Sequence, residues 1–320
     1  MSLIEAYARR FGDTPEIRQY LEIIARAATA PGSPDRLPPD VSDAYHKIDQ
    51  RLGLGSRGVA GAPDADREPF DPDAVYYEAL TLPELNEAVS YGTGGLSNGL
   101  LAPLRTLSFW TMKARARQVG EQAMHPLLIG WQRATSGRDV RFHLVGHSFG
   151  CIVATATIAG PLGSPALPRP VDSLSLLQGA LSIWSYCADI PHARGRAGYF
   201  HRLVSEGRVR GPVITTRSRY DRAVGTWYPL AARAGGQVDF VAKLPRYGAV
   251  GEFGIQGQDL QPVDLALGPQ TVSYPFQSGR MYNLEASRHI CRGGGFSGAH
   301  SDIGRPEVAH AVWSAIGARD

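Results

Sequence analysis

The pentapeptide 146–150, Gly-His-Ser-Phe-Gly, contains the residues of this sequence best suited to chemistry. A serine hydroxyl attacks an acyl carbon when a neighbouring base removes its proton. The G-x-S-x-G spacing suits that role, because glycines on both sides let the chain turn back sharply and hold Ser148 at the top of the turn. The spacing has low specificity by itself, so the interpretation depends on the flanking elements.

The flanking segments favour a strand before the pentapeptide and a helix after it. Residues 140–145 are rich in apolar and β-branched types, and Asp139 marks a turn ahead of them. Residues 149–159 include three alanines and are followed by Gly-Pro at 160–161, which favours a buried helix that ends there. A hairpin is the alternative, because Ile, Val and Thr are poor helix formers. Strand, sharp turn and helix together predict a nucleophile elbow.

Asp221 is the candidate for the acid of such a site. A catalytic imidazole works best when a carboxylate holds it in one tautomer. Where an elbow carries the serine, the carboxylate and then the histidine follow it along the chain. Asp221 fits this order, since it lies just beyond the apolar run 213–216, which predicts a strand. The alternative is a solvated loop aspartate that pairs with Arg219 or Arg222.

His300 is the candidate base. It stands between a strand predicted over 281–284 and a helix predicted over 306–316. Four glycines between positions 293 and 298 would let this loop bring the imidazole over Ser148 without steric cost. We therefore predict that His300 takes the serine proton.

Three nearby residues are alternatives to these assignments. Asp302 is the reserve acid, because a carboxylate two residues after His300 can bond the imidazole or instead cap the last helix. His289 and His310 are rival bases. His289 lies closer to the preceding strand, whereas His310 falls inside the predicted helix, where a histidine more often packs or faces water.

From residue 74 onward the sequence alternates between predicted strands and helices. This alternation predicts an α/β fold with a mostly parallel sheet and helices on both faces. One long or broken helix is expected over 108–134, with Pro126 as the break. The predicted strands cover 74–80, 140–145, 173–177, 213–216 and 281–284.

The N-terminal region has a different pattern. Thr14 and Pro15 predict the start of an amphipathic helix that continues to about residue 30. A short helix is expected over 42–52, and the Gly, Pro and Asp content of 53–73 predicts a linker. The predicted domains are 1–72, a helical accessory segment with its linker, and 73–320, the α/β domain, with a cap or lid insertion at about 227–276.

The motif at 146–150, Asp221 and the segment 298–302, Gly-Ala-His-Ser-Asp, together resemble the α/β-hydrolase superfamily. Within it, segments 108–113 and 280–285 are similar to those of uncharacterised bacterial hydrolase-like proteins. The resemblance implies hydrolysis of an ester, thioester, amide or related bond through an acyl-enzyme. It does not choose among these bonds.

The resemblance covers residues 88–320 and implies a role for each candidate. Ser148 is the nucleophile, His300 moves the proton and Asp221 orients the imidazole. The backbone N–H of Phe149 is expected to bind the oxyanion. We expect a serine esterase, lipase-like enzyme or thioesterase.

One departure from the superfamily pattern concerns the second oxyanion donor. That donor usually comes from a loop after an early strand and is often marked by a His-Gly pair, which this sequence lacks. The glycine-rich loop 91–99 either supplies the missing N–H or is a flexible connection. The alternative function is therefore a catalytically weak or inactive hydrolase-like module that binds a partner through residues 1–72.

Aromatic residues after the strand predicted over 173–177 either form an apolar acyl pocket or belong to the core. Three arginines between 217 and 222 are a weak indication of an anionic substrate headgroup. We expect a small-molecule acyl substrate and no cofactor. The aromatic residues are Trp184, Tyr186, Tyr199 and Phe200.

Composition excludes several other classes. The net charge is +3, but no block of basic residues interleaved with aromatics occurs, so nucleic-acid binding is not indicated. Three cysteines far apart in the sequence and without metal-ligand spacing indicate free thiols and no metal site. The N-terminus lacks the pattern of a secretory signal, and no transmembrane segment is expected. We therefore expect a cytoplasmic protein.

Overall fold

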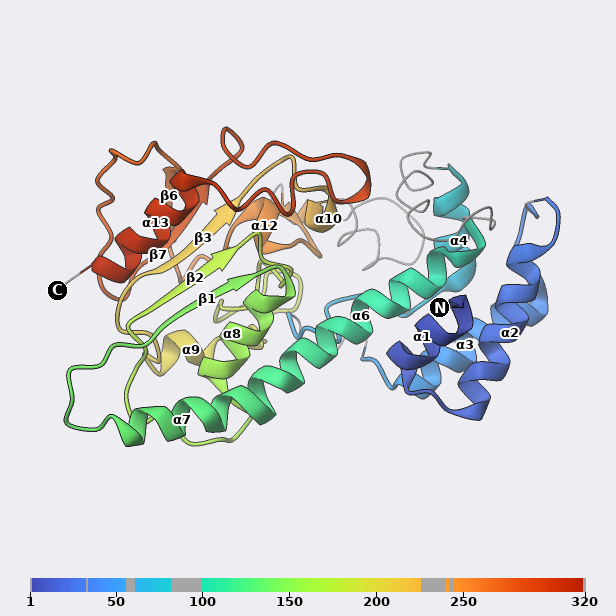
Figure 1. The fold of residues 1–320 in the computed structure, drawn as a ribbon, viewed down its shortest axis with the longest axis horizontal. Coiled ribbons are helices and arrows are strands. Elements are labelled where there is room, and N and C mark those ends of the chain that lie inside the picture. The colour runs from blue at the N-terminus through green and yellow to red at the C-terminus, as the bar shows by residue number, and fades with distance from the viewer. Residues whose placement is uncertain are drawn as a thin grey trace.

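The computed structural model of the chain describes residues 2–32, 34–55, 61–81, 99–225, 240–241 and 244–318. They form a helical part, which contains the N-terminus, and a second part built on a β-sheet. A long helix runs from one part to the other (Figure 1).

The helical part is built around an apolar core to which the long helix contributes its first turns. Its elements are α1 (Leu3–Phe11), α2 (Pro15–Thr29), α3 (Pro39–Leu52), α4 (Pro72–Thr81), the 3-10 turn η1 (Gly99–Leu101) and α6 (Ala102–Gln118). Thr14 caps α2, because its Oγ1 accepts a hydrogen bond from the N–H of Ile17 at 3.3 Å. Leu21 of α2, Tyr45 of α3 and Leu104 of α6 are fully buried together. The two helices predicted in this region are confirmed, although α3 begins earlier than expected.

Residues 74–80, predicted as a strand, form most of α4, so that prediction is wrong. The Asp71 Oδ1 accepts hydrogen bonds from two backbone N–H groups of the first turn, each at 3.0 Å, which starts a helix. Tyr76 and Ala79 are buried side by side at helical spacing. A short apolar run can form either a strand or a helix. Here packing against the neighbouring helices favours the helix.

The middle of the linker predicted over 53–73 is packed against the rest of the protein. Asp64 pairs with Arg117 of α6 at 2.9 Å. Arg67 is 1% exposed and pairs with Asp49 of α3 at 3.0 Å. Apolar residues in this segment do not recur at helical or strand spacing, and its ion-pair partners lie far away in the sequence. The local sequence pattern therefore did not predict the packing.

A sheet of five parallel strands forms the second part, in the order β1-β2-β3-β7-β6. Its strands are β1 (His143–His147), β2 (Ser173–Leu177), β3 (Val213–Arg217), β7 (Met281–Glu285) and β6 (Val263–Ala266). The strands predicted from 140, 173, 213 and 281 are confirmed, with β1 shifted towards the serine. Parallel strands have their carboxyl ends at the same end of the sheet. Ser148, Asp221 and the loop that carries His300 all follow such ends.

Helices cover both faces of the sheet, as predicted. On one face, Ile152 packs with Leu174 and Leu176 of β2. On the other, Val308 packs with Ile214 of β3. Successive residues of a strand point to opposite faces, so both faces must be apolar. The fold is therefore an α/β fold with an open, parallel sheet, and the covering helices are α8 (Phe149–Ala159) and α13 (Pro306–Gly317).

The helix predicted over 108–134 is broken where Pro126 requires it. A π-helical turn precedes the proline, which has no N–H and would clash with the preceding turn of a regular helix. A Cβ on Gly120 would lie 2.5 Å from the Cβ of Ala156, so this turn packs closely on α8. The two elements after α6 are η2 (Val119–Met124) and α7 (His125–Ala134).

The insertion predicted as a cap over 227–276 contributes to the sheet. Its residues 263–266 form β6, which pairs with β7, so the prediction of a separate cap is wrong for this stretch. The pattern Val-Asp-Leu-Ala is too short to predict a strand without its partner. The remaining elements are α9 (Arg202–Ser205), α10 (Arg222–Gly225), β4 (Phe240–Val241), β5 (Leu244–Pro245), α12 (Val250–Phe253) and the 3-10 turn η3 (Gly295–Ser297).

Candidate active site

Ser148 occupies a strained turn between β1 and α8. Its φ of 56° and ψ of −123° are rare for a residue with a side chain and typically cost about 1–3 kcal/mol. Two hydrogen bonds hold the turn against the end of β2: the Ser148 N–H donates to Leu177 O at 3.1 Å, and the Ala180 N–H donates to Ser148 O at 3.2 Å. The predicted strand, turn and helix are confirmed, and the hairpin alternative is wrong.

The two glycines of the motif are not equivalent. A Cβ on Gly146 would lie 2.4 Å from the carbonyl oxygen of Gly150, so only glycine fits at the first position. A Cβ on Gly150 would meet nothing within 4 Å. The sharp return of the chain therefore depends on the glycine before the serine.

His300 and Asp221 form a hydrogen-bonded pair. The Nδ1 of His300 lies 2.8 Å from the Oδ2 of Asp221, and the two residues are 9% and 1% exposed. Asp221 also accepts hydrogen bonds from Gln178 Nε2 at 2.7 Å and from the Val224 N–H at 3.2 Å. These hydrogen bonds fix the orientation of the carboxylate. A proton held on Nδ1 leaves the Nε2 of His300 free to act as a base.

The loops that carry Asp221 and His300 are joined by their backbones. Asp221 and Gly298 form an antiparallel bridge, and the Ala299 N–H donates to Tyr220 O at 2.8 Å. Gly298 has a φ of 54°, and a Cβ there would lie 2.4 Å from Tyr220 O. Glycine at this position thus permits the approach that brings the imidazole to the carboxylate.

Gly298→Ala is expected to separate the two loops, whereas Gly294→Ala is the matched control in the same loop. Gly294 has a φ of −142° and open space around its Cβ position. We expect Gly298→Ala to lower the free energy of unfolding by about 2–4 kcal/mol, and Gly294→Ala to change it by less than about 0.5 kcal/mol. Urea unfolding measures both. Equal stability of the two variants would contradict the assignment.

Ser148 lies at the same end of the sheet as the pair, and its neighbour His147 contacts His300. The Nε2 of His147 is 2.9 Å from the carbonyl oxygen of His300, and the two rings are 4.9 Å apart. The structure describes the side chains of Ser148 and His300, and no hydrogen bond joins the Ser148 hydroxyl to the His300 imidazole. Such catalytic bonds often tighten only when substrate binds. Burial lowers the pKa of His147, which favours a neutral ring beside His300.

Sequence reasoning missed Gln178. This residue follows β2, is fully buried and has a φ of 46°. Its Nε2 bonds both Asp221 and the carbonyl oxygen of Gly251, at 2.7 and 3.1 Å, so it ties the acid to the start of α12. Its position directly after a strand was the only available signal, since an amide is not an obvious catalytic type.

Glu252 was also missed. Burial, with a smaller contribution from the charge of Asp221, raises the pKa of Glu252 from 4.5 to about 7. The residue lies in α12, beside Gly225, and its Oε2 is buried without a hydrogen-bond partner among the described residues. A carboxyl with a raised pKa therefore lies near Asp221.

The Glu252→Gln variant tests this pKa. The folded state binds an extra proton between pH 4.5 and pH 7, so wild-type stability falls as pH rises through that interval. Glutamine removes this slope. We compare the free energy of unfolding of the variant with that of wild type. With allowance for solvent screening, we expect this difference to be about 1–3 kcal/mol more favourable to the variant at pH 8 than at pH 5. Urea unfolding at both pH values is the measurement. A stability difference between variant and wild type that is the same at pH 5 and pH 8 would contradict the raised pKa of Glu252.

The alternative residues have other partners. The Oδ2 of Asp302 accepts hydrogen bonds from the N–H groups of Cys291 and Arg292, and its Oδ1 pairs with Arg305 at 2.5 Å. Burial opposes ionisation of Asp302, but the bonds from Arg305 and the two N–H groups outweigh it and lower its pKa. Asp302 makes no hydrogen bond to His300 in the described structure.

The rival histidines also lie elsewhere. The Nδ1 of His289 is 3.7 Å from Glu307, and the Nε2 of His310 is 2.7 Å from Val272 O. Of the histidines at 289, 300 and 310, only His300 contacts Asp221.

The aromatic residues proposed for an acyl pocket belong mainly to the core. Tyr186 and Phe200 are fully buried, and the Tyr186 hydroxyl lies 2.7 Å from Thr155 Oγ1. The Tyr199 hydroxyl donates to Glu121 at 2.6 Å. Trp184 is also buried, at 3% exposure, but it lines a pocket of 730 Å³ whose other lining residues include Ala188, Arg194 and residues 256–259.

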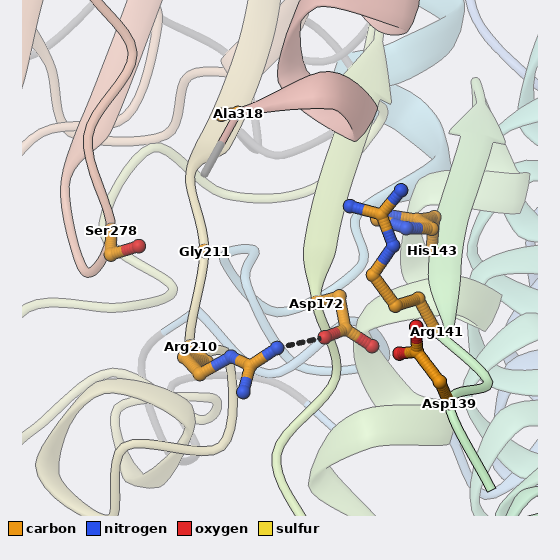
Figure 2. Close-up of a pocket in the computed structure, with 8 residues that line it drawn as sticks. All are labelled: Asp139, Arg141, His143, Asp172, Arg210, Gly211, Ser278 and Ala318. Carbon is orange, nitrogen blue, oxygen red and sulfur yellow. Dashed lines mark hydrogen bonds and ion pairs between the residues drawn. The ribbon is translucent and has the colours of Figure 1, made fainter. Parts of the chain in front are cut away.

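A second pocket of 320 Å³ lies at the opposite end of the sheet (Figure 2). It is bordered by His143 and Asp172, which stand at the amino ends of β1 and β2. Asp172 accepts a hydrogen bond from the Phe142 N–H and pairs with Arg210 at 2.5 Å. Because Ser148, Asp221 and His300 follow carboxyl ends of strands, we assign this pocket no part in their chemistry.

Several other features bear on the sequence predictions. Across the described ranges, no three His, Cys, Asp or Glu side chains gather as metal ligands. The helices that the structure describes include none with the length and hydropathy needed to cross a membrane. The loop predicted to supply the second oxyanion donor, 91–99, lies outside the described residues except for Gly99.

Comparison with protein families, curated proteins and solved structures found no match for this chain.

Proposed function

We propose that the protein is a serine hydrolase of the α/β-hydrolase type that cleaves a carboxylic ester or thioester. The observation that carries the proposal is the Asp221–His300 hydrogen bond at the end of the sheet where a strained Ser148 stands. The sequence order of serine, acid and histidine supports it further. Each residue follows a different strand, as expected of a site assembled by parallel strands.

In the proposed reaction the Ser148 Oγ bonds to the acyl carbon while the Nε2 of His300 takes the hydroxyl proton. The tetrahedral intermediate expels an alcohol or thiol, which receives that proton. Water then attacks the acyl-enzyme by the same route and releases the carboxylic acid and free serine. Asp221 stabilises the imidazolium that forms in both steps.

The N–H of Phe149 is the proposed oxyanion donor. As the first residue of α8, it has no carbonyl partner within its own helix, and the positive end of the helix favours a negative charge there. Its ring packs 5.3 Å from that of Phe109 on α6, which holds the first turn of α8 in position.

A fluorophosphonate probe tests the proposal most directly. Stoichiometric labelling of the wild type, read by intact mass and absent in Ser148→Ala, is the expected result. Hydrolysis of short and long p-nitrophenyl esters and thioesters then separates esterase, lipase and thioesterase preferences. A folded protein that is not labelled would count against an activated serine.

The second candidate is a hydrolase-like module that binds a partner but turns over slowly or not at all. It is favoured by the position of β1, which has a neighbouring strand on only one side in the described structure, and by the absent Ser148–His300 hydrogen bond. Ester turnover no faster than that of Ser148→Ala would support it. The proposed reaction requires no cofactor. A cytoplasmic location completes the proposal, consistent with three free cysteines.

A further inference from the structure

Helix α7 buries two polar residues as well as Leu128, and it leaves two large apolar side chains in solvent. His125 and Gln132 are buried and bonded, His125 to Thr157 O at 2.8 Å and Gln132 to Arg169 O at 3.0 Å. Leu127 and Trp131 face solvent at 42% and 49% exposure. A helix that only covered a sheet would keep its large apolar side chains on the inner face.

The exposed apolar side chains continue onto the neighbouring elements. Met112 of α6 is 38% exposed and Val119 of η2 is 48% exposed. The distance from position 112 to position 131 along a helix is about 28 Å. Figure 1 draws α6 and α7 as a nearly continuous rod, of which the end of α6 and α7 run along the border of the molecule beyond α8. These four residues, Met112, Val119, Leu127 and Trp131, form what we call the outer stripe.

The exposed charges around the outer stripe are mainly positive, although Asp139, next to Arg138, is also exposed. Arg133 and Arg138 are exposed, and no described carboxylate pairs with either. Between positions 112 and 138 the sequence contains one acidic residue, Glu121. Glu121 is 4% exposed and bonds Arg117 and Tyr199, so it presents no negative charge at the surface.

We propose that the outer stripe binds the surface of an anionic lipid bilayer. Exposed Trp and Leu side chains beside arginines are the composition of helices that lie in a membrane interface, where the apolar face enters the acyl boundary and the cations meet lipid phosphates. The stripe follows a convex helix rather than a groove, which suits a fluid surface better than a folded partner. This inference stands independently of the proposed hydrolase activity.

Vesicle flotation tests the proposal, with phosphatidylcholine vesicles compared with vesicles that also contain phosphatidylserine. The full chain carrying Ser148→Ala serves for binding, so that turnover plays no part. We expect flotation with the anionic vesicles and release at high salt. The double variant Leu127→Ser/Trp131→Ser is expected to lower the partition coefficient at least about tenfold, and Arg133→Glu to lower it less.

Trp313→Ser is the matched control, because Trp313 is 69% exposed but lies on α13. It should float like the parent. Circular dichroism melting of all variants checks that they fold. No binding to anionic vesicles, or binding unchanged by the double variant, would overturn the proposal. So would a wild type that sediments as a dimer, becomes monomeric on Trp131→Ser and ignores vesicles, since the stripe would then bind a second copy.

Discussion

Replacement of Ser148 by alanine is expected to lower kcat/KM for an activated ester by about 10⁴- to 10⁶-fold while leaving the fold intact. The substitution removes the only atom that can form the acyl-enzyme. It also tests the elbow: alanine retains the Cβ at a φ of 56°, so any loss of stability should be small. Initial rates with p-nitrophenyl acetate and p-nitrophenyl octanoate, together with thermal unfolding, provide the two measurements.

A double variant makes this prediction sharper. Ser148 and His300 are expected to act as a unit, so Ser148→Ala/His300→Ala should retain about the same residual rate as either single variant. Multiplication of the two losses would show that the residues contribute separately. A Ser148→Ala protein with normal turnover would remove Ser148 from the chemistry altogether.

The second large effect is expected for Asp221→Asn. The asparagine amide can present its N–H to the Nδ1 of His300, which stabilises the tautomer that has its proton on Nε2 and cannot act as a base towards serine. A loss of about 10⁴-fold in kcat is typical of this change in a serine triad. The measurement is ester turnover at saturating substrate, with fluorophosphonate labelling rates as a second readout.

Asp302→Asn is the matched control for that prediction, because Asp302 bonds Arg305 and two backbone N–H groups rather than the imidazole. It should lower stability modestly and leave kcat within a few-fold of wild type. If Asp302→Asn removed turnover and Asp221→Asn did not, the assignment of the acid would be reversed. Comparison of the two variants in one turnover assay therefore shows which carboxylate supports His300.

The sequence predicted the elements around the candidate site well, because their signals are local. A proline at the first turn of α13 and apolar runs at β2, β3 and β7 identify each element without knowledge of its partners. The pentapeptide predicted the strained turn at Ser148 for the same reason. The order of Ser148, Asp221 and His300, each after its own strand, followed from these elements.

Contacts between distant segments were not predictable in this way. Gln178 meets Asp221 across 43 positions of sequence, and Glu252 stands near the same carboxylate from α12. Neither residue type is distinctive, and neither has a motif. Their roles follow from the packing of loops that only the parallel sheet brings to one end.

The same distinction explains the wrong element predictions. Residues 74–80 form a helix because Tyr76 and Ala79 pack against other helices, and residues 263–266 form a strand because β7 offers an unpaired side. The apolar pattern of either segment is compatible with both structures.

Sequence alone determined the α/β class, the elbow and the chemical types at the candidate site, since turn residues and apolar periodicity act over a few neighbouring positions. The tertiary structure decided that Asp221 rather than Asp302 meets His300, and that Leu127 and Trp131 face outward. Both outcomes depend on free energies of contact and burial between segments far apart in the chain, which no local pattern contains.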